Sequence, residues 1–96
     1  MILHTVKTSP FQTFALADCV KLMAKEDTLL LIEDAVIASQ AQHACSTQLR
    51  SLSAQGRLMV LSADLDARGI ENCIGKTCSY LDFVNLVINH KSQLAW

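Results

Sequence analysis

The sequence contains few glycines, prolines, aromatic residues and charges. Its three glycines are too dispersed for a phosphate-binding loop, and it has no GxxxxGK[ST], GxGxxG or GxSxG motif. These absences exclude the usual nucleotide-binding and hydrolase sites. Aromatic residues make up 5% of the chain and the basic residues are scattered. Because binding to phosphate backbones requires clustered cations, we expect no direct contact with nucleic acid.

Long apolar runs are also absent. A run such as residues 29–32 is far too short to span a bilayer, and the N-terminus lacks the charged and apolar regions of a secretory signal. We therefore expect a cytoplasmic chain without membrane contact, and a single domain over residues 1–96. The composition is 51% hydrophobic and 18% charged, against about 25% charged in a typical globular protein. This excess of apolar residues predicts burial against a partner subunit.

Apolar runs alternate with helical patterns along the chain. Such an order predicts an α/β fold, namely a small three-layer open parallel sheet of about four strands with helices on both faces. The run at residues 28–32 has no polar alternation, which is typical of a central strand buried on both faces. The predicted strands are residues 2–6, 28–32, 57–61 and a weaker one around Cys78 that ends near Ser79.

The helices are predicted from caps and from the spacing of apolar residues. Ser9 and Pro10 suit the N-cap and first position of a helix that runs to about Lys25. Asp34 is predicted to cap the next helix, and weak helical turns follow between residues 39 and 55. Shorter helices are expected at residues 64–69 and 81–90, before the tail at residues 92–96. On the first helix we expect one buried face, made by Phe11, Phe14, Ala15, Cys19, Leu22 and Met23.

Four cysteines are the candidate chemical groups: Cys19, Cys45, Cys73 and Cys78. No CxxC motif is present, and reduced thiols are expected in the cytoplasm. Cys19 lies on the apolar face of the first helix, where a structural role is favoured. Cys78 lies where a strand leads into a helix, a position that can stabilise a thiolate. Burial of Cys78 within the strand is an equally good interpretation.

Metal sites are not predicted. The set formed by His43, Cys45, Cys73 and Cys78 has no usual zinc spacing. Glu33 and Asp34 stand at a strand end, where two carboxylates can hold Mg²⁺, but a helix cap beside a solvated side chain is the favoured interpretation. A receiver domain is excluded because Ser62-Ala63 occupies the place of its phosphoacceptor aspartate. We expect no metal and no cofactor.

Five segments, in this order and spacing, resemble the TusB/DsrH family from end to end. They are Ile2-Leu3-His4-Thr5-Val6 with Ser9-Pro10-Phe11, Leu29-Leu30-Leu31-Ile32-Glu33-Asp34, Asp64-Leu65-Asp66-Ala67-Arg68-Gly69, Asp82-Phe83-Val84, and Ser92-Gln93-Leu94-Ala95-Trp96. The resemblance implies a DsrEFH-like fold and a subunit of a cytoplasmic sulfurtransferase complex. In that complex it joins TusC-like and TusD-like subunits in a heterohexamer with two copies of each.

The resemblance also implies the chemistry of the complex. Persulfide sulfur passes from a sulfur carrier protein toward 2-thiolation of the tRNA wobble uridine, by thiolate attack on sulfur. The relay cysteine of the TusB branch belongs to the TusD-like subunit, so the implied role of this chain is structural or accessory and non-catalytic. Cys19 matches a cysteine of the DsrH branch, which serves sulfur oxidation. The alternatives are therefore a DsrH-type role, or a stand-alone sulfur carrier that uses Cys19 or Cys78.

Overall fold

The computed structural model describes residues 1–40, 42–71 and 74–96. Within these residues, five strands form one parallel sheet in the order β4-β3-β2-β1-β5. The strands are β1 (Ile2–Val6), β2 (Thr28–Leu31), β3 (Leu58–Leu61), β4 (Lys76–Cys78) and β5 (Ser92–Ala95). The helices are α1 (Ala15–Leu22), the 3₁₀ helix η1 (Glu33–Ser39), α2 (Ser46–Ala54), α3 (Ser62–Ala67) and α4 (Tyr80–Asn89).

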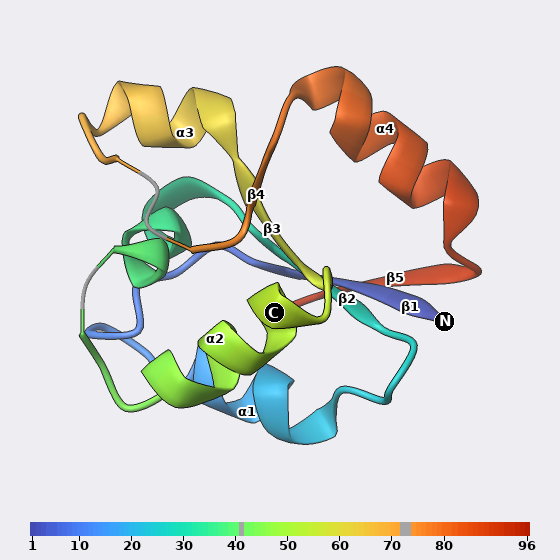
Figure 1. Cartoon of the computed structure of the whole chain (residues 1–96), viewed down its shortest axis with the longest axis horizontal. Coiled ribbons are helices and arrows are strands. Elements are labelled where there is room, and N and C mark those ends of the chain that lie inside the picture. The colour runs from blue at the N-terminus through green and yellow to red at the C-terminus, as the bar shows by residue number, and fades with distance from the viewer. Residues whose placement is uncertain (41, 72–73) are drawn as a thin grey trace.

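The core lies on both faces of the sheet. Leu29, Leu30 and Leu31 of the central strand β2 are fully buried, as the unbroken apolar run predicts. Leu29 and Leu31 pack in the larger cluster with side chains of α1 and α2. Leu30 packs in the smaller cluster, beside side chains of α4. Figure 1 shows α1 and α2 on one side of the sheet and α4 on the other, which confirms the predicted three-layer α/β fold.

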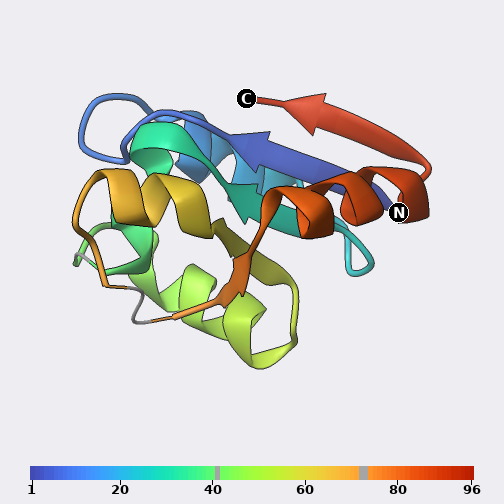
Figure 2. The ribbon, with the colours of Figure 1, turned by 90° about the horizontal axis from the view of Figure 1, so that it is seen from above.

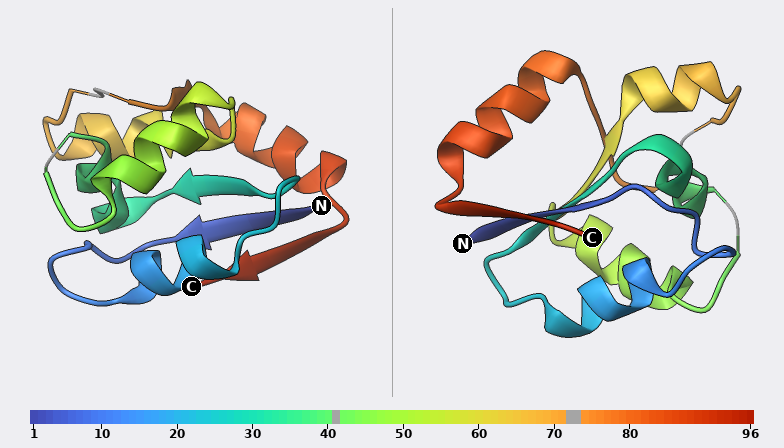
Figure 3. Two further views of the ribbon diagram at one scale, coloured as in Figure 1. Left: turned by 60° about the horizontal axis from the view of Figure 1, so that its bottom comes forward. Right: turned by 180° about the vertical axis from the view of Figure 1, so that it is seen from behind.

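The sheet has one strand more than the expected four. Residues 92–95, predicted only as a tail, form β5, which pairs with β1 in parallel register from Ile2 and Ser92 onward. Figure 2 shows β5 beside β1 at the edge of the sheet, and the left view of Figure 3 shows the arrows of β5, β1 and β2 pointing the same way. Main-chain pairing with β1 outweighs the low strand preference of the sequence Ser-Gln-Leu-Ala.

The first helix is shorter than predicted at both ends. It begins at Ala15 and ends at Leu22. The late start has a local cause, because side-chain oxygens before the helix form turns instead. The Oγ of Ser9 accepts from the backbone N–H of Phe11, and the Oγ1 of Thr13 accepts from that of Ala15. Such side-chain bonds compete with helix formation. The predicted buried face is therefore partly wrong, since the exposed side chains are Phe11 at 61%, Phe14 at 83% and Leu22 at 68%.

The predicted cap at Asp34 is also wrong. The helix that follows β2 is η1, its N-cap is Ile32, and no side chain caps it. Asp34 instead pairs with Arg68, whose Nη2 lies 2.9 Å from its Oδ1. Glu33 has a φ of 48°, in the left-handed region, and its backbone N–H donates to Asp64. Through this contact, Asp64 of α3 satisfies a backbone N–H group at the start of η1, which is the role expected of a side-chain cap.

The remaining helices lie close to their predicted places. The weak pattern between residues 39 and 55 contains a helix of nine residues, α2. The helix expected at residues 64–69 is α3, which begins two residues earlier, at Ser62. Among the described residues, no helix is both long enough and apolar enough to cross a membrane.

Candidate functional site

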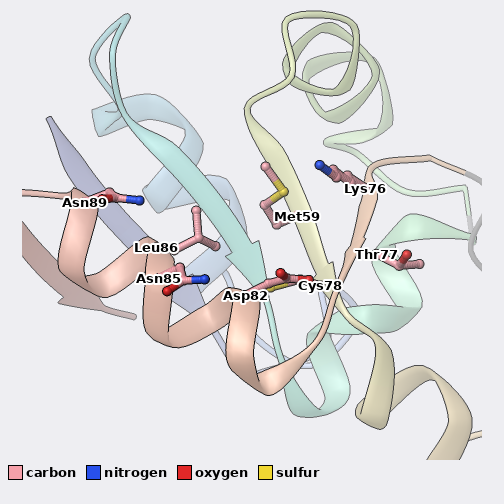
Figure 4. Close-up of a pocket in the computed structure, with 8 residues that line it drawn as sticks. All are labelled: Met59, Lys76, Thr77, Cys78, Asp82, Asn85, Leu86 and Asn89. Atoms are coloured by element: carbon pink, nitrogen blue, oxygen red, sulfur yellow. The ribbon is translucent and has the colours of Figure 1, made fainter.

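The strand β4, the helix α4 and Met59 of β3 line a small hollow beside Cys78. Its volume is about 190 Å³, which is room for a few water molecules. Figure 4 shows the amide side chains of α4 along one side of the hollow and Lys76 on the other. The lining residues are Met59, Lys76, Thr77, Cys78, Asp82, Asn85, Leu86 and Asn89.

The start of α4 is held by a capping box. The Oγ of Ser79 accepts from the backbone N–H of Asp82, and the Asp82 carboxylate accepts from the N–H of Ser79. The hydrogen bond that the Asp82 carboxylate accepts from the Ser79 backbone, and then its interaction with the Ser79 side chain, lower the pKa of Asp82. Each partner satisfies a donor that the helix end would otherwise leave free. The capping box therefore fixes the direction in which the chain leaves Cys78.

The thiol of Cys78 is buried, with 1% of the residue exposed. Its Sγ donates to the carbonyl oxygen of Ser79 at 3.4 Å. Burial, and then the negative charge of Asp82, raise the pKa of Cys78, and the positive charge of Lys76 opposes them only in part. Because a thiolate is needed for attack on sulfur, this thiol is a poor nucleophile at neutral pH.

Cys19 and Cys45 are buried as well. Cys19 lies on the inner side of α1 and is fully buried in the larger core cluster. Burial, and then the charge of Asp27, raise the pKa of Cys19 to about 12. Burial likewise raises the pKa of Cys45, against an opposing effect of Lys21. The structure does not bring Cys19 and Cys78 together, since they pack in clusters on opposite faces of the sheet.

The residues considered as metal ligands do not converge. Asp34 pairs with Arg68, and the ring of His43 contacts the backbone of Ala38 and Cys45. Cys73 lies outside the described residues. Across residues 1–40, 42–71 and 74–96, no group of three or more His, Cys, Asp or Glu side chains could hold a metal ion.

A buried polar network joins the N-terminal end of the sheet to the C-terminal segment. The Nε2 of His4 lies 2.9 Å from Oδ2 of Asp27, and the indole Nε1 of Trp96 lies 3.0 Å from Nδ1 of His4. Because an indole N–H only donates, Nδ1 must accept, and Nε2 therefore carries the proton that it donates to Asp27. The ring of His4 is 2% exposed, and both of its nitrogens have partners.

Asp27 is the centre of this network. Its carboxylate also accepts from the backbone N–H groups of Ile2, at 3.0 Å, and Ala24, at 2.9 Å. Burial acts to raise the pKa of Asp27, but the hydrogen bonds from Ala24, His4 and Ile2 outweigh burial and lower it to about 2. We interpret the network as structural, because His4 and Asp27 are buried and are paired with each other, with Trp96 and with backbone N–H groups.

This network was not predicted from the sequence. One signal was present in the sequence, since a buried histidine needs partners for its ring nitrogens. Leu3 lies opposite Thr28 in the parallel register, which places Asp27 next to Ile2, two residues before His4. The contact with Trp96 had no such signal, because the fifth strand was not predicted.

Comparison with known proteins identifies the family of this chain. Residues 8–93 match the family model described as "DsrH like protein". Similar proteins named "Protein TusB" come from Klebsiella pneumoniae subsp. pneumoniae, with 39% identity over 99 residues, from Erwinia tasmaniensis, with 38% over 98, and from Photorhabdus laumondii, with 35% over 99. Each alignment covers 99% of this chain and 100% of the relative. The chain therefore belongs to the DsrH-like family, together with these TusB proteins.

Proposed function

We propose that this protein is an accessory subunit of a cytoplasmic sulfur-relay complex. The complex passes persulfide sulfur toward 2-thiolation of the wobble uridine of tRNA. The proposed partners are TusC-like and TusD-like subunits, in a heterohexamer with two copies of each. Membership of the DsrH-like family supports the relay.

One observation carries the accessory role: every cysteine in the described part of the chain is buried. In sulfur transfer, a thiolate attacks the terminal sulfur of a persulfide, forms a new persulfide and releases the donor as a thiolate. That step requires an accessible, deprotonated thiol. The thiols of Cys19, Cys45 and Cys78 are instead enclosed, and burial raises the pKa of each. None of these three thiols suits that step, which supports a relay nucleophile on a partner subunit.

The assembly is tested by co-expression with TusC-like and TusD-like subunits from the same host. Native mass spectrometry of the purified material is expected to show the heterohexamer. Recovery of this chain alone, as a monomer or homo-oligomer, would contradict the proposal.

The accessory role is tested separately with Cys19→Ser, Cys19→Ala and Cys78→Ser. The alanine variant controls for the hydroxyl that serine buries in the core. Each variant is expected to assemble, and to transfer sulfur from a persulfide-loaded donor protein at the wild-type rate. Loss of transfer by an assembled variant would instead make this chain a sulfur carrier.

A further inference from the structure

Helix α4 has three distinct sides, although it has only ten residues. At about 100° per residue, Phe83 and Leu86 share one side of the helix. Both pack against the smaller core cluster, between α4 and the sheet. The second side is polar, and it lines the hollow at Cys78 with Asp82, Asn85 and Asn89. The third side, which we call the outer stripe, consists of Tyr80, Leu81, Val84, Val87 and Ile88.

The outer stripe is apolar and exposed. None of the residues of α4 is buried. The exposed fractions are 62% for Tyr80, 70% for Leu81, 54% for Val84, 41% for Val87 and 71% for Ile88. In the views of Figures 1 and 3, no other described element lies over the outer side of α4.

The area of the outer stripe is close to what an interface needs. Its five residues expose on the order of 500 Å², which is in the upper part of the range of about 300–600 Å² for the largest apolar patch of a monomer, a patch that is often functional. A standard protein interface buries about 800 Å² on each partner, with an apolar centre and a polar rim. The stripe thus supplies most of the apolar centre of one standard interface.

The shape of the stripe indicates which kind of element covers it. Two rows of side chains with a spacing of four residues run along the helix: Val84 with Ile88 within the stripe, and Val87 with Phe83, which borders the stripe from the core-facing side. Between them lies a hollow of about 210 Å³, lined by these four apolar side chains alone. Rows of this spacing with a groove between them are the geometry into which a ridge of a second helix packs.

The charges near the stripe further define its partner. Within α4 the one charged side chain is Asp82, which lies on the polar side and is engaged in the capping box. An apolar, uncharged helix face is the complement of such a surface, since a charge buried against it would lack a partner.

We propose that the outer stripe of α4 is the surface on which a companion subunit of the relay complex docks, through an uncharged apolar helix. This inference rests on the proposed function and adds to it the site of assembly and the kind of element that binds there. The companion is a different subunit, and α4 is expected to remain uncovered when this chain is alone.

The test replaces Ile88 with aspartate and uses Leu22→Asp as a matched control. The two side chains are exposed to similar extents, 71% and 68%, but Leu22 lies on α1, which covers the opposite face of the sheet. Each variant is co-expressed with the TusC-like and TusD-like subunits. Ile88→Asp is expected to weaken assembly by on the order of a hundredfold, as for a central interface residue. Leu22→Asp is expected to assemble like the wild type.

Two further measurements keep the outcomes separate. Circular dichroism of each isolated variant establishes that it folds, and amide hydrogen exchange of residues 80–89 is compared between the isolated wild-type chain and the wild-type complex. Slower exchange in the complex is the expected result.

If the wild type forms no complex, the proposed function fails, and the inference fails with it. If the wild type assembles but Ile88→Asp assembles equally well and exchange is unchanged, the docking site is wrong while the function stands. A homodimer of the isolated chain through α4 also overturns the inference.

Discussion

Asp27 offers a direct test of the polar network, through the variant Asp27→Asn. The two carboxylate oxygens of Asp27 accept three hydrogen bonds, from Ile2, Ala24 and the ring of His4. An asparagine side chain has one oxygen, so its NH₂ group must face at least one of these donors. A buried donor is then left without an acceptor, and the charge that strengthens the bonds is lost.

The magnitude follows from the pKa of Asp27, which the network lowers from 3.8 to about 2. At about 1.36 kcal/mol per pH unit, the difference corresponds to about 2 kcal/mol of stability. The folded protein holds the carboxylate ionised. This contribution to stability is therefore present in full well above pH 3.8, and it is lost as the pH falls toward 2. At neutral pH, Asp27→Asn is expected to lose about 2 to 4 kcal/mol of unfolding free energy, including the unsatisfied donor.

Urea unfolding followed by the fluorescence of Trp96 measures this effect, since Trp96 is the one tryptophan in the sequence and touches the network. The difference in stability between wild type and Asp27→Asn should shrink by about 2 kcal/mol as the pH falls from about 5 to about 2. Asp18→Asn, an exposed change on α1, is the control and should not alter the wild-type pH profile in this way. A difference between wild type and Asp27→Asn that stays constant over this range would refute the reasoning.

Three further predictions concern the thiols, the helix cap and the tryptophan. Iodoacetamide at neutral pH should leave Cys19 and Cys78 unmodified until urea unfolds the chain, because burial raises the pKa of both thiols. Peptide mapping that finds either cysteine alkylated in the native protein would contradict this prediction. Ser79→Ala should lower the free energy of unfolding by about 1 kcal/mol through loss of the capping box, and an unchanged urea midpoint would show that the cap does not stabilise α4. Trp96→Phe should lower the free energy of unfolding by about 1 kcal/mol, because it removes the hydrogen bond to His4. Circular dichroism in urea measures this change. A larger decrease in an Asp27→Asn background than in wild type would contradict the shared network.

Most of the fold was predictable because its central strands carry strong local signals. The apolar runs of β1, β2 and β3 are β-branched or leucine-rich, and their burial follows directly from the pattern. The strand β5 was not predictable in this way. Its four residues are all exposed, so neither face of the strand produces an alternation of apolar and polar residues. Its pairing depends on contact with β1, which is distant in the sequence.

The start of the first helix shows a second limit. Ser9-Pro10 has the composition of a helix start, but the same side-chain oxygens also stabilise isolated turns. The choice between the two depends on what the following residues bury. Phe11 and Phe14 fit a helical spacing, yet both side chains are exposed. Spacing alone therefore could not show that the helix begins only at Ala15.

The candidate site was predictable in position but not in chemical state. The junction of a strand and a helix at Cys78 was correctly expected from the sequence. The state of the thiol depends on burial by α4, on Asp82 and on Lys76, and these are tertiary contacts. A helix N-terminus favours a thiolate only where the thiol is not desolvated at the same time.

The pairing of β5 with β1 has a consequence for the folding kinetics. Trp96 and His4 are separated by 92 positions, whereas β1 and β2 pair over a separation of about 25 residues. Closing the longer loop costs more chain entropy and requires the intervening elements to be in place. We therefore expect β5 to dock late, after β1, β2 and β3 have joined, and to detach first in partial unfolding. Mutations in the tail should then mainly accelerate unfolding and leave the folding rate nearly unchanged.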